Sequence, residues 1–325
     1  MSPSMGAYHA DEEDHQFHKG VKHLCEKGIT KVPKKYILPV LERPNAGKDD
    51  GIFSNNDHNL MLPVIDFAQL QGSNRVQALH SLSKACEEYG FFQLINHGIS
   101  SEVTSRMVQE GRKFFELPFE ERSKEAAVNY SEQTKFLYMM LVEATLESLG
   151  LVGNTKSGNE NESYLKEFED GSQIIVVNCY PSCPEPDLTL GMPSHSDYGF
   201  LTLLLQDELV KGLQIQHQGR WVTVEPIPNS FVVNVGDHLE IFSNGRYKSV
   251  LHRVLVNPSQ SRISIASLHS LPFSCAIRPS PKLINDANRK RYKDTDFASF
   301  MEYITSCEHK NKNFLESRKL DLIGK

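Results

Sequence analysis

The chain has 325 residues and a formal net charge of −6, with 39% hydrophobic and 23% charged residues. These proportions are typical of a globular protein with one or two domains, and the acidic balance weighs against nucleic acid as the main partner. No apolar stretch is long enough to span a bilayer, and six cysteines are too few for a disulfide scaffold in a chain of this length. The acidic run at 11–14 fits neither a transit peptide nor a signal peptide. We therefore expect a cytoplasmic protein, with the nucleus as an alternative, and no membrane partner.

Residues 1–60 form a polar leader in which one short helix is expected. Phe17, Val21 and Leu24 recur there at helical spacing, and Gly28 is expected to end the helix. The segment GIFSNNDHN at 51–59 is rich in turn residues and is expected to be a loop.

Two short strands and three helices are expected between residues 61 and 170. The strands are the apolar runs LPVIDF and FFQLINHGI. The first helix is capped by Ser73 or Asn74, ends at Gly90 and has one apolar face: Val76, Leu79, Leu82 and Cys86. The second begins near Ser101, ends at Pro118 and repeats every four residues: Val103, Met107, Gly111 and Phe115. The third runs from Phe136 to Leu149 and closes with Gly150.

Beyond this region the hydrophobic period changes from 3.6 to 2. Seven short β-rich runs follow, and such spacing over about 100 residues predicts an all-β barrel or sandwich. The runs are SQIIVVNCY, FLTLLLQ, GLQIQ, WVTVE, FVVNVGD, SVLHRVLV and RISIASLHS. Gly219, in QHQGRW, is suited to a hairpin turn. The tail from Tyr292 is helical, so the architecture is mixed α and β.

A histidine and an aspartate open the run SHSDYGFLTLLL. In a strand, residues i and i+2 face the same way, so His195 and Asp197 can point into one cavity. The pair alone is weak evidence, because His9 and Asp11 repeat it in the polar leader. His252 strengthens it as a polar residue in the run SVLHRVLV, where it lies between Leu251 and Arg253. Two imidazoles and a carboxylate form the facial triad of non-haem Fe(II) oxygenases, which leaves coordination positions open.

Arg262 and Ser264 follow at i and i+2 in the next predicted strand. An arginine fork binds a carboxylate through two hydrogen bonds, and a serine hydroxyl can add a third. Arg278 and Ser280 repeat this pattern as well, so the signal is the ordered combination of His-x-Asp, His and Arg-x-Ser.

The chain resembles the plant 2-oxoglutarate- and Fe(II)-dependent dioxygenases, the group that includes flavonoid, gibberellin and alkaloid oxidases. The resemblance covers most of the chain and includes LPVIDF, ACEEYGFFQLINHGI, FFELPFEER, NCYPSCPEPDLTLGMPSHSDYGFLTLLLQD and RISIASLHSLP. It implies a double-stranded β-helix core (jelly-roll, cupin-like) with flanking N-terminal and C-terminal helices. The implied division is a leader at 1–60, a helical region at 61–170, the jelly-roll domain at 171–273 and a helical tail at 274–325.

The resemblance also implies the site residues. His195, Asp197 and His252 would bind Fe(II), and Arg262 with Ser264 would hold the distal carboxylate of 2-oxoglutarate. Asn178 and Tyr180, in NCYP, match the family's additional co-substrate contacts. O2 is the further co-substrate, and ascorbate is expected as the reductant.

Other candidates are open between two roles. Tyr198, Phe200 and Phe273 are expected either to line the substrate pocket or to pack in the core. His97 is expected to be structural, and His238 and His269 to be packing residues or neighbours of the ligands.

One departure from the family lies in the middle of the chain. Only SKEAAVNYSEQTK separates FFELPFEER from the helix FLYMMLVEATLESLGL, where the family has several dozen residues that wall the substrate pocket. We expect a monomeric enzyme that oxidises a small plant metabolite. The alternative is a catalytically impaired metal-binding member that acts as a binding or decoy protein. A zinc hydrolase is disfavoured, because it leaves Arg262 and Ser264 unexplained.

Overall fold

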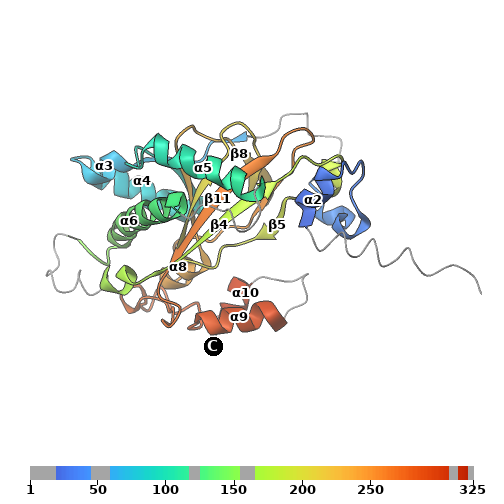
Figure 1. Ribbon diagram of the computed structural model, residues 1–325. Helices are drawn as coiled ribbons and strands as arrows, with labels where there is room; N and C mark the ends of the chain where they lie inside the picture. The colour runs from blue at the N-terminus through green and yellow to red at the C-terminus, as the bar shows by residue number, and fades with distance from the viewer. Residues whose placement is uncertain (1–19, 45–58, 117–124, 154–164, 307–313, 321–325) are drawn as a thin grey trace, which may run out of the picture.

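The computed structural model describes residues 20–44, 59–116, 125–153, 165–306 and 314–320. Two β-sheets form its centre (Figure 1). The larger sheet has the order β2 (Val64–Asp66), β3 (Phe91–Ile95), β9 (Phe231–Val235), β6 (Leu201–Gln206), β11 (Arg262–Ser270) and β4 (Ser172–Tyr180). The smaller sheet has the order β1 (Asn59–Leu60), β8 (Arg220–Val224), β7 (Leu213–His217), β10 (His252–Val254) and β5 (Met192–His195). This is the expected jelly-roll core with helices around it.

Helices flank the core at both ends of the chain. They are α2 (Gly20–Glu26), α3 (Phe67–Gln71), α4 (Arg75–Glu88), α5 (Ser101–Glu116), α6 (Glu125–Ser148), α8 (Asp237–Phe242), α9 (Phe297–Ser306) and α10 (Phe314–Arg318). Short 3-10 turns occur at Lys34–Tyr36, Val40–Glu42, Pro186–Leu188 and Pro281–Leu283. Helices α4, α5 and α6 contact the larger sheet, while α9 and α10 lie at the opposite side of the molecule (Figure 1). None of the helices in the described part of the chain is both long and apolar enough to cross a membrane.

Period-two alternation gives β11 two different faces. Ile263 and Ile265 are buried in the hydrophobic core, whereas Ala266, Leu268 and Ser270 line a cavity. Since successive side chains of a strand point to opposite sides, one strand both closes the core and furnishes the cavity wall.

The hairpin predicted at Gly219 is confirmed. Gln218 and Gly219 have φ of 50° and 77°, and His217 pairs with Arg220 across the turn. Two successive residues with positive φ are typical of a type I′ turn, whose twist suits a tight antiparallel hairpin.

The helical predictions need two corrections. Val76 is 82% exposed, so of the four residues predicted for the buried face of α4 only Leu79, Leu82 and Cys86 are buried. Helix α6 begins at Glu125 rather than Phe136, because Tyr130 and other buried residues extend its apolar face toward the N-terminus.

Candidate metal centre and co-substrate site

Two neighbouring strands bring three metal-ligand side chains together. His195 ends β5, His252 begins β10, and the two residues are Cα partners in the antiparallel pair. Oδ1 of Asp197 lies 3.8 Å from Nε2 of His195 and 3.6 Å from Nε2 of His252. One potential ligand atom from each residue lies within 4.8 Å of the other two. This is the cluster expected from the sequence, whereas His9 and Asp11 lie outside the described residues.

Asp197 reaches this cluster from a loop, not from the strand. The strand β5 stops at His195, so strand alternation does not orient Asp197 as the sequence suggested. Instead the backbone N–H of Asp237, at the start of α8, donates to the carbonyl oxygen of Asp197 at 2.7 Å. Gly236 makes this approach possible, because a Cβ there would stand only 2.1 Å from the carbonyl oxygen of Gly199.

Backbone carbonyls set the tautomer of both histidines. Nδ1 of His195 donates to the carbonyl of Pro193 at 2.8 Å, and Nδ1 of His252 donates to that of Val250 at 3.2 Å. A carbonyl oxygen only accepts, so Nδ1 carries the proton and the lone pair of Nε2 is free. Hydrogen bonds of this kind orient imidazole ligands in metal sites, and the arrangement therefore fits a metal ion.

The charge states of the cluster also suit a cation. Burial lowers the pKa of His252 to about 4 against the opposing attraction of Asp197, so its imidazole is neutral near pH 7. Burial by itself raises the pKa of Asp197, but the two histidines and a hydrogen bond from Asn234 outweigh it and hold that pKa below its usual value. Two imidazoles and one carboxylate are the donor set of a facial triad.

Arg262 presents free donors in the interior. It is 2% exposed, and Nη2 donates to Oε1 of Gln206 at 3.1 Å. Its Nε and Nη1 have no hydrogen-bond partner among the described residues. Unpaired donors of a buried guanidinium are costly, and they match the geometry of a carboxylate.

The other co-substrate candidates lie beside Arg262 on neighbouring strands. Tyr180 of β4 is the Cα partner of Arg262, and Asn178 is the partner of Ser264. The guanidinium carbon of Arg262 lies 5.5 Å from the centroid of the Tyr180 ring. All four predicted residues thus occupy one corner between β4 and β11.

A cavity opens beside the metal cluster and has one aromatic wall. His195, Asp197, Tyr198 and Phe273 line it, as do Phe297 and Phe300 from α9. The Tyr198 ring lies 4.1 Å from that of Phe300, and Phe273 lies 4.3 Å from Phe297. Of the two roles expected for Phe200, pocket lining is not observed: its side chain is fully buried and packs against Phe168 and Phe242 in the core.

The remaining histidines have structural partners. His97 is buried and bonds the carbonyl of Asn229 through Nε2. His269 stacks on Tyr138 at 4.4 Å and bonds Ser267, while His238 bonds Ser270. Burial lowers the pKa of His238 and of His269 to about 3, so both are neutral near pH 7.

Three contributors were missed in the sequence. Asn234 supports Asp197, and Phe297 with Phe300 completes the aromatic wall. Asn234 is a polar residue that interrupts the apolar run FVVNVGD, and His252 likewise interrupts the run SVLHRVLV.

The fold and the cluster together define a jelly-roll oxygenase with a non-haem Fe(II) centre. Sequence comparison agrees: residues 171–270 match the 2OG-Fe(II) oxygenase superfamily, and residues 62–163 match the N-terminal region of non-haem dioxygenases in morphine synthesis. The chain belongs to the 2OG-Fe(II) oxygenase superfamily and is a 2-oxoglutarate- and Fe(II)-dependent dioxygenase.

Plant proteins are among its relatives. The chain is 30% identical to Protein DMR6-LIKE OXYGENASE 2 of Arabidopsis thaliana over 345 residues, which covers 90% of this chain and 95% of that protein. It is 34% identical to Feruloyl CoA ortho-hydroxylase 2 of the same plant, over 91% of this chain and 92% of that one. The crystal structure of JOX2 in complex with 2OG, Fe and JA superposes with a TM-score of 0.77 at 27% identity, over 92% of this chain and 97% of that one. The first alignment is longer than the 325 residues of this chain, so that relative has positions without a counterpart here.

Proposed function

We propose that the enzyme couples the oxidative decarboxylation of 2-oxoglutarate to the hydroxylation, or a related oxidation, of a small plant metabolite. In this proposal His195, Asp197 and His252 hold Fe(II). The observation that carries it is the convergence of two Nε2 lone pairs and one carboxylate. When bound, Fe(II) supplies open coordination positions for the co-substrate and for O2.

We assign the recognition of 2-oxoglutarate to the corner between β4 and β11. Arg262 offers Nε and Nη1 to the distal carboxylate, and the Ser264 hydroxyl lies on the next residue of the same strand face. Asn178 and Tyr180 face this corner from β4. Because the Arg262 side chain is buried, the ion pair forms away from solvent, where charge-assisted hydrogen bonds are strong.

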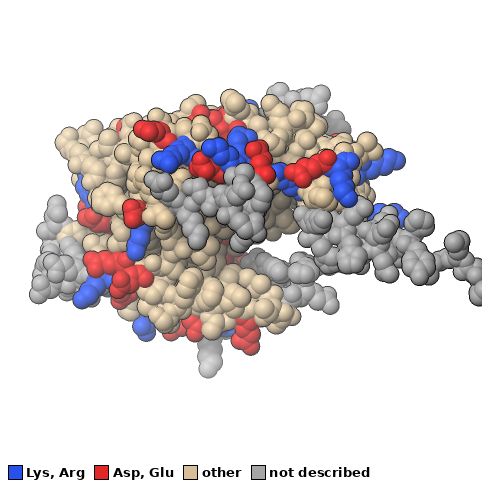
Figure 2. Space-filling model, viewed as in Figure 1, with Lys and Arg blue, Asp and Glu red and all other residues tan. Residues whose placement is uncertain are grey.

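The substrate is proposed to lie against the aromatic wall of Tyr198, Phe273, Phe297 and Phe300. Flat apolar rings favour a ligand with an aromatic or other apolar body. The names of two relatives, Feruloyl CoA ortho-hydroxylase 2 and Flavanone 3-dioxygenase 2 of rice, support a plant metabolite of this kind. Figure 2 shows the surface hollowed between α9 and the body of the molecule, beside this cavity.

The setting of the reaction is part of the proposal. All proposed metal and co-substrate residues come from one chain, which supports a monomer as the working unit. The cysteines of the described residues are free thiols, which supports the reducing cytoplasm. We assign the four segments 1–60, 61–170, 171–273 and 274–325 as leader, helical region, catalytic domain and tail. The decoy alternative is not favoured, since the ligand set and the co-substrate corner are both assembled.

A metabolite screen tests this function. The full chain is incubated with Fe(II), ascorbate, 2-oxoglutarate and plant phenolic compounds, and succinate is measured. We expect succinate formation that depends on iron and rises with a specific compound. If no compound raises it and the protein binds no 2-oxoglutarate, the proposal is wrong.

A further inference from the structure

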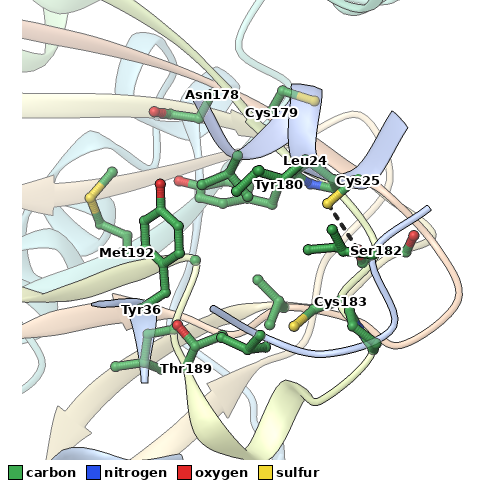
Figure 3. A pocket seen from close by; sticks show the side chains of 18 of the residues that line it. Leu24, Cys25, Tyr36, Asn178, Cys179, Tyr180, Ser182, Cys183, Thr189 and Met192 are labelled. Atoms are coloured by element: carbon green, nitrogen blue, oxygen red, sulfur yellow. Dashed lines mark hydrogen bonds between the residues drawn. The ribbon is translucent and has the colours of Figure 1, made fainter. Parts of the chain in front are cut away.

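A second cavity lies away from the metal, beneath the N-terminal helix. Its volume is about 300 Å³. One wall comes from α2 and the segment after it, including Leu24, Val32 and Tyr36, and the other from the end of β4 and the turn toward β5, including Tyr180 and Cys183 (Figure 3). Sites for small molecules span roughly 300–1,000 Å³, so this cavity has room for a small ligand.

The lining of this second cavity is uncharged. It combines aliphatic side chains and prolines with three thiols, and no Asp, Glu, Lys, Arg or His is among the described residues that line it. Its polar groups are few: the amide of Asn178, which has no hydrogen-bond partner among the described residues, the hydroxyls of Tyr36 and Thr189, and Ser182. An apolar pocket with a few polar groups is typical of a site for a neutral organic molecule.

The cavity touches the co-substrate corner. Asn178 and Met192 line both this cavity and the one beside the metal. Tyr180 forms part of its wall while its ring packs close to the Arg262 guanidinium. Gly191 lies against the Tyr180 ring, since a Cβ there would be 2.6 Å from Tyr180 Cδ1. A molecule in the second cavity would therefore contact Asn178 and Tyr180, the two side chains of β4 that are proposed to face 2-oxoglutarate.

We propose that the second cavity binds a small, uncharged, largely apolar molecule of one or two rings, and that its occupancy strengthens the binding of 2-oxoglutarate. The second half rests on the proposed function. The ligand contacts Asn178 and Tyr180 from the side opposite the co-substrate and fixes these two side chains. The second molecule to bind then loses less conformational entropy, because the side chains are already ordered. Such coupling is reciprocal, with typical effects of about 5- to 150-fold in affinity.

Binding is tested on the full chain without iron, using the neutral fluorophore N-phenyl-1-naphthylamine. Thr189→Trp fills the cavity, and Thr305→Trp on the exposed face of α9 is the matched control. We expect the first variant to weaken probe binding at least about 10-fold and the control to match the wild type, with unchanged circular dichroism in both. Equal binding in all three proteins, or no binding to the wild type, would overturn the proposal.

Cysteine labelling shows where the probe binds without relying on the variants. Cys25 and Cys179 line the cavity and Cys275 does not, while all three are partly exposed. Cys25 donates from Sγ to the carbonyl of Ser182 at 3.6 Å, across the cavity wall (Figure 3). We expect the probe to slow maleimide labelling of Cys25 and Cys179 but not of Cys275, as read by peptide mass spectrometry. Uniform labelling rates with and without the probe would contradict the site.

A separate measurement tests the coupling between the second cavity and 2-oxoglutarate binding. The affinity for 2-oxoglutarate is measured anaerobically with Mn(II), with and without saturating probe, and we expect at least about 5-fold tighter binding with it. Equal affinities would overturn the coupling but leave the binding site intact. Absence of 2-oxoglutarate binding under both conditions would instead refute the proposed function.

Discussion

Asn234 donates a hydrogen bond from Nδ2 to Oδ2 of Asp197 at 2.8 Å, from within the fully buried strand β9. That bond occupies one carboxylate oxygen and leaves Oδ1 facing both imidazoles. Asn234 is therefore a positioning residue for the metal cluster.

Asn234→Ala is expected to weaken Fe(II) affinity by about 10- to 100-fold, since partners of metal ligands have effects of this size. Asn74→Ala is the control, because Asn74 is exposed and makes no side-chain cap bond on α4. Iron content is measured at limiting Fe(II). Equal iron in the two variants would show that Asp197 does not need this support.

Replacing any one of His195, Asp197 and His252 with Ala is expected to abolish tight Fe(II) binding, since two remaining ligands cannot hold the ion. His80→Ala, at an exposed position of α4, should keep the wild-type iron content. Elemental analysis of the purified proteins gives the answer. Iron retained in all three variants would contradict the assignment of these residues as iron ligands.

Arg262→Lys is expected to weaken 2-oxoglutarate binding by about 10- to 150-fold, because a charged hydrogen bond contributes roughly 1.5–3 kcal/mol. Lysine is a point charge and cannot replace the planar fork. Arg278→Lys, at an exposed position, is the control. Calorimetric titration compares them, and similar small effects at both positions would mean that Arg262 is not the anchor.

His269 should make the fold sensitive to acid. Burial lowers its pKa to about 3 in the folded state, so below about pH 6.5 the unfolded chain binds a proton that the folded chain does not. Unfolding then becomes more favourable as the pH falls, and this residue accounts for about 2 kcal/mol between pH 7 and pH 5.

Urea unfolding of His269→Gln should reveal this effect as a smaller loss of stability between those two pH values than in the wild type. Gln does not titrate, whereas His80→Gln leaves the buried imidazole in place and should behave as the wild type does. The same pH dependence in both variants would assign the acid sensitivity to other groups.

The sequence predicts a middle segment shorter than in the family, and we expect such a shortening to loosen the coupling between the two half-reactions. Catalysis requires the reacting carbon to be held in place, and a missing wall weakens that placement and admits water. We expect more succinate than oxidised product, and restored coupling when the missing segment of a full-length relative is grafted after residue 122. One succinate per product in the chain as it stands would show that the segment is dispensable.

The metal cluster could be predicted because its signals are local. His252 interrupts an apolar run, and His195 with Asp197 opens another. A search for polar residues that interrupt apolar runs would also have found Asn234. The roles of Tyr198 and Phe200 could not be separated in the sequence, because residues 198–200 form a bend in which the two side chains point to different surroundings.

Other features of the fold depend on contacts between distant segments, which no local sequence pattern predicts. The second cavity joins Leu24 of α2 to Cys183 beyond β4, two segments far apart in the chain. Val76 fits the apolar periodicity of α4, yet it is exposed in the first turn of that helix. The sheet order places β10 between β7 and β5, and this order arises from long-range pairing.

The position of β10 has a kinetic consequence. His252 is held by strands on both sides, whereas His195 stands on β5, which pairs with β10 alone at the end of its sheet. The side chain of His195 is 36% exposed and that of His252 is 10% exposed. We therefore expect the three residues to differ in lability as ligands, with His195 the first to release a bound ion. A chelator would reach the site most readily from the side of that exposed imidazole.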